Sequence, residues 1–366
     1  MQKNLWSKIT IFNPSIEDGG VEKNLFLITN FFASNNINTS IISADKIKKK
    51  EFIKKVNFIN PKVINFKKSG RYKKYFFCLL LLIKRILFNK DKNIFSFQAN
   101  IYCIIISKLL GAKIIVRMNT APQGWEHNYI KKKIYSFFIK KADGIIVNSK
   151  NFQKEVESRF DIKPIHINNP FDFKKIKKLS QKKTKSLFLK NSLKLISIGR
   201  ITEQKDQITI LKSLLILKKK KIKFKFLLLG KGHLRKRLEK FIVKNNLKED
   251  IKILGFQSNP FSILKQADIF ILSSLYEGSP NVLIEALFLN KKIITTNCPT
   301  GPSEILSNKD YGEFFKIQNH NQLANKIIKL KNSRKKIIPK SFFKKYDAKF
   351  ICSKYKNYVM KIFYFE

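Results

Sequence analysis

The sequence predicts an α/β protein with two doubly wound parallel sheets, and three observations support this class. Short apolar runs alternate with longer helical segments along both halves of the chain. A Lys- and Ser-rich stretch separates the two halves. At 366 residues the chain is long enough for two domains with complete cores.

The first half alternates between strands and helices. Its apolar runs are short and rich in Ile, Val and Phe, as expected of buried parallel strands, and helical periodicity fills the segments between them. We expect strands at Lys8–Asn13, Asn38–Ser43, Ile94–Phe97, Lys113–Arg117, Gly144–Asn148 and Pro164–Ile167, and helices at Val21–Ser34, Arg71–Phe88, Ile101–Leu110, Tyr129–Lys140 and Asn151–Arg159.

The second half repeats this alternation, which predicts a second parallel sheet. We expect strands at Leu193–Ile198, Phe224–Leu229, Ile251–Phe256, Ile269–Ser274, Lys292–Thr296 and Glu313–Ile317, and helices at Gln207–Lys218, Leu234–Asn245, Phe261–Gln266, Asn281–Leu289 and Asn321–Lys331. The resulting domain ranges are 1–175, a linker at 176–191, 192–340, and a helical segment at 341–366 that packs back on the first domain.

Charge and cysteine content limit the classes of binding partner and the cellular compartment that we expect. The formal net charge of +50 predicts an anionic partner: a membrane surface, a nucleic acid or a phosphorylated substrate. A/T-rich codons are the alternative source of the lysines, because Lys, Asn, Ile and Phe are enriched together. The four cysteines are scattered, which fits a reducing cytoplasm. We expect no signal peptide, because the N-terminus leads directly into a strand.

The longest apolar run, Tyr75–Ile83, is about half the length that a membrane-spanning helix needs. It lies within the expected helix Arg71–Phe88, whose ends are basic. An apolar middle of this kind predicts a helix buried in the core. The alternative is a helix that docks on a bilayer interface.

The most informative stretch is EGSPNVLIE, Glu277–Glu285, which follows an apolar strand and opens a helix. Pro280 suits the first helical position, and the amides after it are unpaired donors at the positive end of the helix dipole. Such a helix start binds phosphate. The residues expected to bind a phosphorylated ligand here are Gly278, Ser279, Pro280, Asn281, Val282 and Leu283.

Two carboxylates bracket this turn. Glu285 lies four residues after Asn281, so that both are on one helix face, and Glu277 precedes the helix. The arrangement fits a sugar nucleotide, with one carboxylate on ribose hydroxyls and the other on the sugar. The alternative is an ordinary strand, turn and helix with surface glutamates.

Cations follow the first strand of the second half. The stretch LKLISIGRITEQKD, Leu193–Asp206, places Arg200 and Lys205 at the carboxyl end of a buried strand. Open α/β sheets bind ligands at this edge, and Arg and Lys both pair with a diphosphate. In a chain with 75 Lys and Arg residues, a solvated loop lysine is the alternative.

Another glycine-rich turn lies at the first strand–helix junction, DGGVE, Asp18–Glu22. Gly19 and Gly20 allow the backbone to approach a phosphate closely. The alternative is a flexible loop.

Taken together, the motifs resemble the retaining glycosyltransferases of family 4, which have the GT-B fold. The resemblance runs through GRITEQKD, FLLLGKGH, ILGFQSNP, QADIFILSSLYEGSPNVLIEAL and TTNCPTGPSEIL, and covers most of residues 193–317. The CPTGPSEIL stretch is similar to a bacterial branch that builds surface polysaccharides and lipid-linked oligosaccharides. The first half resembles the family more loosely, through EDGGVEKNL, KADGIIVNS and NNPFD.

The resemblance implies two Rossmann-like domains facing each other across a cleft, with the donor, a UDP-linked hexose or N-acetylhexosamine, on the second. Arg200 and Lys205 would stabilise the leaving diphosphate, Glu285 would bind ribose and Glu277 the transferred sugar. It also assigns Phe256, in ILGFQSNP, to the donor site, and gives Gly19 and Gly20 a role at the donor phosphates or the acceptor.

The acceptor region departs from the family. Many members have a histidine after the fourth long strand, whereas this chain has Arg117, Met118 and Asn119, with His127 further along. We assign Arg117 and Asn119 to the acceptor, a glycan or lipid-linked glycan, and leave the histidine role unassigned.

No metal or other cofactor is expected, because Asp-x-Asp and HExxH patterns do not occur. The predicted enzyme lies on the cytoplasmic face of an anionic membrane and binds no nucleic acid. Two alternatives stay open: a sugar-nucleotide epimerase of the same fold, which needs its own acid and base, and a polyanion-binding protein based on charge alone.

Overall fold

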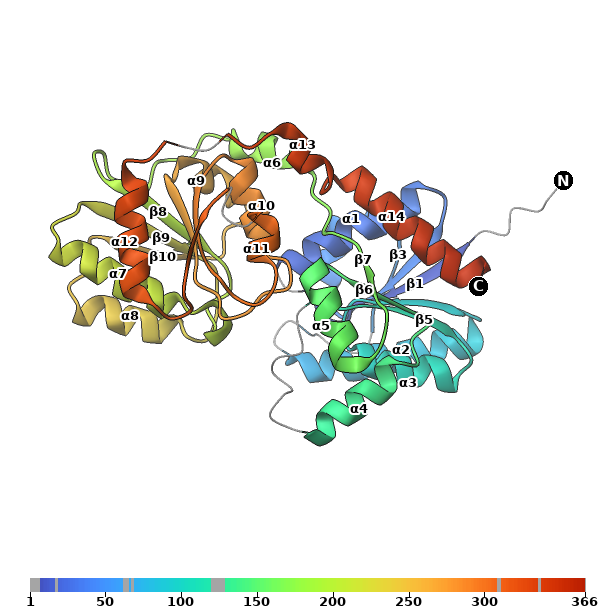
Figure 1. Ribbon diagram of the computed structural model, residues 1–366. Coiled ribbons are helices and arrows are strands. Elements are labelled where there is room, and N and C mark those ends of the chain that lie inside the picture. Colours follow the sequence, from blue (N-terminus) through green and yellow to red (C-terminus); the bar gives the residue numbers. More distant parts are fainter. Residues whose placement is uncertain are drawn as a thin grey trace. The chain divides into compact units, whose positions relative to one another are not determined.

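The computed structural model describes residues 7–16, 19–61, 66, 69–119, 129–307, 311–334 and 337–365. The chain forms two compact units, each built on one sheet (Figure 1). The first contains the chain up to Phe171 together with Lys345–Glu366, and the second is Asp172–Lys344.

The first unit has a seven-stranded sheet with the order β3-β2-β1-β4-β5-β6-β7. Every described pairing is parallel. The strands are β1 Lys8–Phe12, β2 Asn38–Ile42, β3 Asn57–Ile59, β4 Asn93–Ser96, β5 Lys113–Arg117, β6 Gly144–Val147 and β7 Ile165–His166. The helices are α1 Gly20–Ser34, η1 Lys46–Glu51, α2 Arg71–Phe88, α3 Asn100–Leu109, α4 Tyr129–Ile139, α5 Lys150–Phe160, α14 Ala348–Met360 and η5 Lys361–Phe365.

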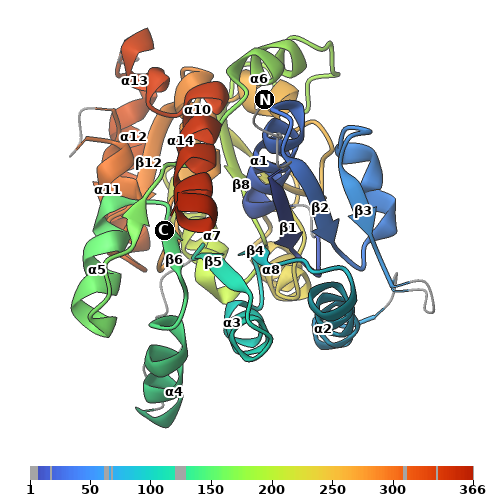
Figure 2. The same ribbon diagram turned by 90° about the vertical axis from the view of Figure 1, so that its right-hand side faces the viewer.

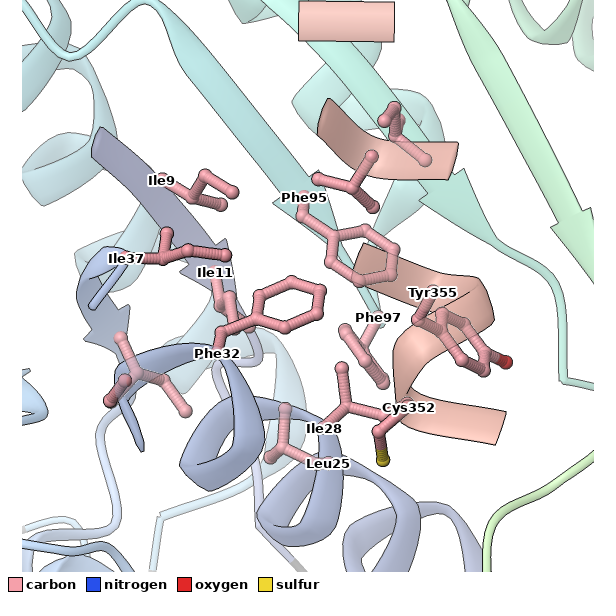
Figure 3. Close-up of a cluster of buried hydrophobic side chains, with 14 of the residues drawn as sticks. Ile9, Ile11, Leu25, Ile28, Phe32, Ile37, Phe95, Phe97, Cys352 and Tyr355 are labelled. Carbon is pink, nitrogen blue, oxygen red and sulfur yellow. The ribbon is translucent and has the colours of Figure 1, made fainter. Parts of the chain in front are cut away.

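Helices cover both faces of this sheet. On one face α1 and α14 enclose a cluster that includes Phe32, Phe95 and Tyr355 (Figure 3). The other face is covered by α2, α3, α4 and α5, whose buried side chains form a second cluster. Figure 2 shows α2 and α3 side by side, and α4 packs against α3. The C-terminal helix is thus part of the first unit.

The second unit has a six-stranded parallel sheet with the order β10-β9-β8-β11-β12-β13. Its strands are β8 Leu193–Ile198, β9 Phe224–Leu229, β10 Ile251–Gly255, β11 Ile269–Leu272, β12 Lys292–Thr296 and β13 Glu313–Phe315. Its helices are α6 Phe173–Ser180, η4 Glu203–Lys205, α7 Gln207–Lys219, α8 Arg235–Lys244, α9 Phe261–Gln266, α10 Asn281–Phe288, α11 Pro302–Ile305, α12 His320–Lys331 and α13 Lys340–Lys344. These two sheets confirm the predicted class.

The predicted linker is only partly irregular. Residues 173–180 form α6. Asp172 precedes this helix, and its side chain accepts a hydrogen bond from the amide of Lys175 (2.8 Å). Ile176 is buried, and the helix packs against α9. The lysines within this helix, Lys174, Lys175, Lys177 and Lys178, are exposed, and for this reason a Lys-rich composition did not reveal the helix.

The prediction that α2 is a core helix was wrong. Only Cys78, Leu82 and Ile86 are buried, on the side of α2 that faces the sheet. On the opposite side Phe76 and Leu80 are exposed. A run of apolar residues does not show which side of the helix packs against another element. In α2 one side is exposed to solvent. None of the helices in the described part of the chain is long and apolar enough to cross a membrane.

Candidate functional site

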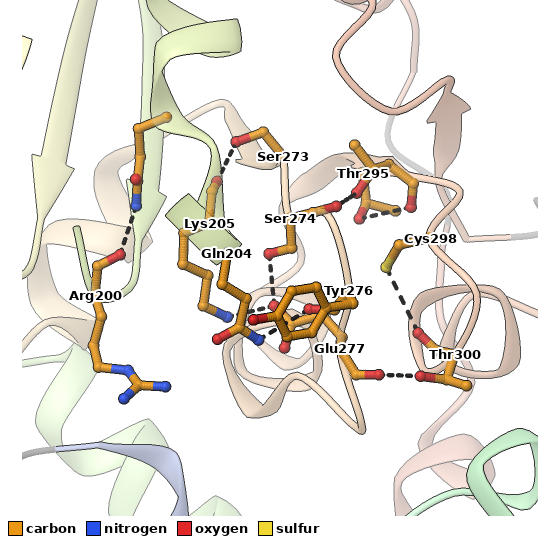
Figure 4. Close-up of polar contacts among 12 residues, drawn as sticks. Arg200, Gln204, Lys205, Ser273, Ser274, Tyr276, Glu277, Thr295, Cys298 and Thr300 are labelled. Atoms are coloured by element: carbon orange, nitrogen blue, oxygen red, sulfur yellow. Dashed lines mark hydrogen bonds and ion pairs between the residues drawn. The ribbon is translucent and has the colours of Figure 1, made fainter. Parts of the chain in front are cut away.

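Two loops meet at the carboxyl ends of β8 and β11, which are neighbours in the second sheet. The Leu275 amide donates to the Gln204 carbonyl (2.8 Å), and Gln204 Nε2 donates to the carbonyl of Tyr276 (3.0 Å). Ser273 Oγ donates to the carbonyl of Lys205 (2.7 Å). These bonds hold the loop after β8 against the loop after β11 (Figure 4).

The side chains of Lys205 and Glu277 form an ion pair within these loops. Ser274 Oγ donates a hydrogen bond to the same Glu277 oxygen, Oε1 (2.6 Å). The lysine side chain is 14% exposed and the glutamate side chain 7%, so the pair is screened only partly by water. The structure therefore brings together two residues that the sequence predicted to act on one ligand.

The end of β12 and the loop that follows it contact the segment that contains Glu277. Thr296 Oγ1 donates to the carbonyl of Ser274 (2.6 Å), and the Thr300 hydroxyl donates to the carbonyl of Glu277. Gly301 has φ +85°, and a Cβ there would lie 2.5 Å from the carbonyl oxygen of Gly278. Only glycine allows the loop after β12 to come this close to the turn at 278–280.

Arg200 has a different environment from Lys205. Its carbonyl accepts a hydrogen bond from Gln207 Nε2 (2.8 Å), whereas its exposed guanidinium has no ion-pair partner among the residues that the structure describes. In Figure 4 its side chain lies apart from the Lys205–Glu277 pair. The neighbouring backbone is closely packed, because a Cβ at Gly232 would lie 1.9 Å from the carbonyl oxygen of Ile201.

The turn at 278–280 leads into α10. Pro280 is the residue that precedes the helix, not its first residue as predicted, and its carbonyl accepts a hydrogen bond from the amide of Leu283 (3.0 Å). One of the three amides expected to bind phosphate is therefore engaged within the helix. Glu285 is 3% exposed and Asn281 8% exposed, both on the inner side of α10.

Phe256 follows β10, next to β9 in the sheet. Its ring is 40% exposed, and the ammonium of Lys231 lies 5.6 Å from the ring centroid. An exposed aromatic ring at a strand end is suited to stacking against a planar group, with the cation over its face.

The predicted residues of the first unit have structural partners. Arg117 is 1% exposed, and it donates from Nε to the Tyr355 hydroxyl (2.9 Å) and from Nη2 to Asn169 Oδ1 (2.6 Å). Asn119 Nδ2 donates to the carbonyl of Phe97 (3.0 Å). Arg117 thereby joins α14 to the end of β5, and any contact with an acceptor stays a prediction.

Gly19 precedes α1, which begins at Gly20. A Cβ at Gly19 would lie 2.7 Å from a carboxylate oxygen of Glu22, which is the acidic residue of the first turn. An internal carboxylate therefore already occupies the positive end of this helix. His127 lies outside the described residues.

Burial changes the acidity of two groups near the pair. Burial, followed by the negative charge of Glu277, raises the pKa of the Cys298 thiol to about 12. Desolvation also raises the pKa of the Asp206 carboxyl, against the hydrogen bond that it accepts from Thr209 Oγ1 (2.7 Å). The thiol stays protonated at neutral pH and is no nucleophile.

Three hydroxyl residues that hold the segment 274–277 were not predicted from the sequence: Ser274, Thr296 and Thr300. Ser274 and Thr296 lie at or just beyond the ends of adjacent parallel strands. That position was the available signal, because the carboxyl ends of such strands line the ligand edge of an α/β sheet. In the described residues no group of three or more His, Cys, Asp or Glu side chains is arranged to hold a metal ion.

Comparisons with known proteins identify the class. Residues 180–344 match the family model described as glycosyl transferases group 1. The second unit is thus a glycosyltransferase domain of this family, and the two Rossmann-like units are those of the GT-B fold. The family assignment of the sequence analysis is thereby confirmed at the level of the group 1 domain.

Individual relatives that the chain matches are also named as glycosyltransferases. The chain is 41% identical over 179 residues to an uncharacterized glycosyltransferase of Methanocaldococcus jannaschii, a match over 47% of the chain and 44% of the relative. It is 26% identical over 229 residues, 61% of the chain and 62% of the relative, to N-acetylgalactosamine-N,N'-diacetylbacillosaminyl-diphospho-undecaprenol 4-alpha-N-acetylgalactosaminyltransferase of Campylobacter jejuni. The chain thus covers about half to three-fifths of the length of these two relatives.

Among solved structures, HepE of Anabaena in complex with UDP and glucose superposes with a TM-score of 0.76. It covers 96% of this chain and 99% of its own, at 17% sequence identity. At this identity the likeness establishes the fold of both units.

Proposed function

We propose that the protein is a retaining glycosyltransferase that transfers a sugar from a UDP-linked hexose or N-acetylhexosamine to a growing glycan or lipid-linked acceptor in cell-surface polysaccharide synthesis. One observation carries the proposal. Within a glycosyl transferases group 1 domain, Lys205 and Glu277 meet at the ends of adjacent strands, beside the start of α10. A cation, a carboxylate and a helix N-terminus together suit a diphosphate that carries a sugar.

The names of relatives support the choice of substrates. HepE was solved with UDP and glucose, which favours a UDP-linked donor. The Campylobacter relative is named for a diphospho-undecaprenol compound, which favours a lipid-linked acceptor. With such an acceptor we place the protein peripherally on the anionic cytoplasmic face of a membrane. The charge of +50 and four free cysteines fit that location.

In the proposed reaction, the bond between the anomeric carbon and the β-phosphate oxygen breaks as an acceptor hydroxyl attacks from the same face. Arg200 and Lys205 stabilise the charge that develops on the diphosphate, with amides at the start of α10. Glu285 binds ribose hydroxyls. Glu277 orients the sugar and stabilises its oxocarbenium-like transition state. The leaving phosphate accepts the acceptor's proton, and no step requires a metal.

The ion pair between Lys205 and Glu277 adds one step to donor binding. Because Lys205 is paired with Glu277, its ammonium has to turn towards the diphosphate while Glu277 turns to the sugar. Arg200 needs no such exchange within the described structure and supplies the first attraction for the diphosphate. Donor binding therefore requires the two side chains of this ion pair to separate.

Thermal protection by a panel of UDP-, GDP- and ADP-sugars tests this proposal. We expect a UDP-sugar to raise the unfolding midpoint, because a ligand at 100 times its Kd stabilises by about 2.7 kcal/mol. Protection only by a polynucleotide, and lost with salt, would instead identify a polyanion-binding protein. Conversion of the donor to its epimer without an acceptor would identify an epimerase.

A further inference from the structure

The outer surface of α2, α3 and α4 in the first unit is unusually apolar. Of the 19 large apolar side chains that are exposed among the described residues, nine lie on these three helices. We call them the α2–α4 face. They are Tyr72, Phe76, Leu80, Leu87 and Phe88 on α2, Tyr102 and Leu109 on α3, and Ile134 and Phe137 on α4.

Three of the exposed apolar side chains on α2 form one stripe. Tyr72, Phe76 and Leu80 follow each other at intervals of four residues, which places them on the same side of the helix. They are 82%, 59% and 47% exposed. The buried side chains of α2 lie on the opposite side, against the sheet. The stripe therefore points outward and is covered by no other described element.

The charge of these helices has one sign. The sequences of α2, α3 and α4 contain nine Lys and Arg residues and no Asp or Glu. Lys73 and Lys84 on α2 and Lys132 and Lys133 on α4 are exposed beside the apolar side chains. Long basic side chains that flank apolar ones can reach phosphate groups while the apolar ones enter a less polar layer.

A neighbouring helix shows that this composition is not imposed by the fold. Helix α5 covers the same face of the sheet, through Phe152, Val156 and Phe160. It exposes no large apolar side chain among its described residues and contains Glu155 and Glu157. Helix α8 of the second unit is also basic, yet Val243 is its one exposed large apolar residue. General lysine enrichment therefore does not explain the apolar stripe.

We propose that the α2–α4 face docks on a bilayer rich in anionic phospholipids, with Tyr72, Phe76 and Leu80 at the interface and the flanking lysines on the headgroups. A second copy of the chain fits less well, because two faces without any acidic residue would repel each other. The proposal rests on the proposed function in one respect only, that a lipid-linked acceptor brings the enzyme to the bilayer.

The exposed apolar side chains change how vesicle binding should depend on salt concentration. Attraction between lysines and headgroups decays within a Debye length of about 8 Å at physiological ionic strength. Burial of aromatic and leucine side chains does not weaken with salt in this way. Binding to anionic vesicles should therefore fall with salt but retain a residual part that depends on Phe76 and Leu80.

The test measures sedimentation of the full chain with vesicles of phosphatidylcholine, alone or with about 30% phosphatidylglycerol, at low and high salt. We compare wild type with Phe76→Ser/Leu80→Ser and with Lys73→Glu/Lys84→Glu. Matched controls change similarly exposed residues elsewhere: Val243→Ser/Phe350→Ser and Lys240→Glu/Lys244→Glu. UDP binding and the unfolding midpoint are measured for every variant.

We expect both α2 variants to bind phosphatidylglycerol vesicles about tenfold more weakly or worse, with unchanged UDP binding, and both controls to bind as wild type does. If the control variants lost vesicle binding to the same extent, the proposal would be overturned, because binding would then depend on charge spread over the whole protein. A monomer produced only by Phe76→Ser/Leu80→Ser from a dimeric wild type would assign the face to a second copy. A wild type that binds UDP but no vesicles would overturn the face and leave the proposed function standing, whereas vesicle binding without UDP binding would do the reverse.

Discussion

Lys205 and Glu277, which are 72 residues apart in the chain, form an ion pair at the ends of adjacent strands β8 and β11. Ser274 adds a hydroxyl to the same carboxylate, and Thr300 binds the Glu277 carbonyl. The two groups expected to act on different parts of the donor are thus paired with each other. This relationship changes what substitutions at either position should do.

Substitution of Lys205 should affect stability as well as turnover. Lys205→Met removes a cation at the leaving group, worth about 3 kcal/mol in the transition state. It also leaves the largely buried Glu277 carboxylate with the Ser274 hydroxyl as its remaining described partner. Breaking such a buried pair costs about 3–5 kcal/mol. We expect turnover to fall at least about a hundredfold and the chemical denaturation midpoint to fall with it.

The double variant Lys205→Met/Glu277→Gln separates the two effects. It should regain most of the lost stability, because no unpaired charge stays buried, but none of the turnover. Lys223→Met, an exposed lysine at the opposite end of the sheet, is the control and should match wild type in both. Wild-type turnover in folded Lys205→Met protein would exclude the phosphate role.

The two glutamates should differ in their effect on UDP itself. Glu285→Gln should weaken UDP binding by about tenfold to a hundredfold, because ribose hydroxyls lose a charged acceptor worth about 1.5–3 kcal/mol. Glu277→Gln should bind UDP at least as tightly as wild type, since Lys205 loses its competing partner, and should impair sugar transfer. Calorimetry with UDP provides the comparison. Wild-type affinity in both variants would mean that this division of roles is wrong.

Gly301→Ala should reduce donor affinity. The new Cβ would lie 2.5 Å from the Gly278 carbonyl oxygen, at a φ of +85° that disfavours alanine, so the turn at 278–280 has to move. Gly70→Ala is a matched control, because no atom lies within 4 Å of its added Cβ. UDP titration should show weaker binding only for Gly301→Ala. Equal binding by the two variants would show that the close contact does not position the site.

Asp206 should make stability depend on pH. Desolvation raises the pKa of its carboxyl in the folded state, so its contribution is fully present below the unfolded pKa and is lost as pH rises through the folded pKa. Asp206→Asn should therefore be more stable than wild type at pH 7, and the difference should shrink towards pH 4. Denaturant unfolding at both pH values measures it.

Asp161→Asn is the control for this substitution. Asp161 has a similar positive φ, 51° against 42°, but its side chain is fully exposed. Any preference of asparagine for this backbone conformation is therefore common to both variants and independent of pH. A stability difference for Asp206→Asn that does not change with pH would refute the desolvation argument.

Strands with continuous apolar runs could be predicted closely from the sequence. Lys113–Arg117 and Leu193–Ile198 have the predicted bounds, because buried parallel strands need apolar residues on both faces. The edge strand β3, Asn57–Ile59, was missed, since three partly exposed residues show no such pattern. Which side of α2 is covered depends on its neighbours in space, and periodicity along one segment does not contain that information.

The candidate site was predictable where its residues lie in contiguous motifs. Glu277, Glu285, Arg200 and Lys205 belong to two short stretches, each of which runs from the end of a strand towards or into a helix. The pairing of Lys205 with Glu277 was not predictable, because it depends on the order of β8 and β11 in the sheet. Arg117 shows the same limit, since its partner Tyr355 lies 238 residues away on the C-terminal helix.

The central claim is that the chain transfers a sugar from a UDP-linked donor with retention. The most direct measurement incubates the protein with UDP-α-linked sugars and a lipid-diphosphate-linked glycan acceptor, and determines the mass and the anomeric configuration of the product. We expect an acceptor heavier by one sugar, joined in the α configuration, and no product with Lys205→Met/Glu277→Gln. A β-linked product would contradict retention, and the absence of transfer from every donor that binds would contradict the claim itself.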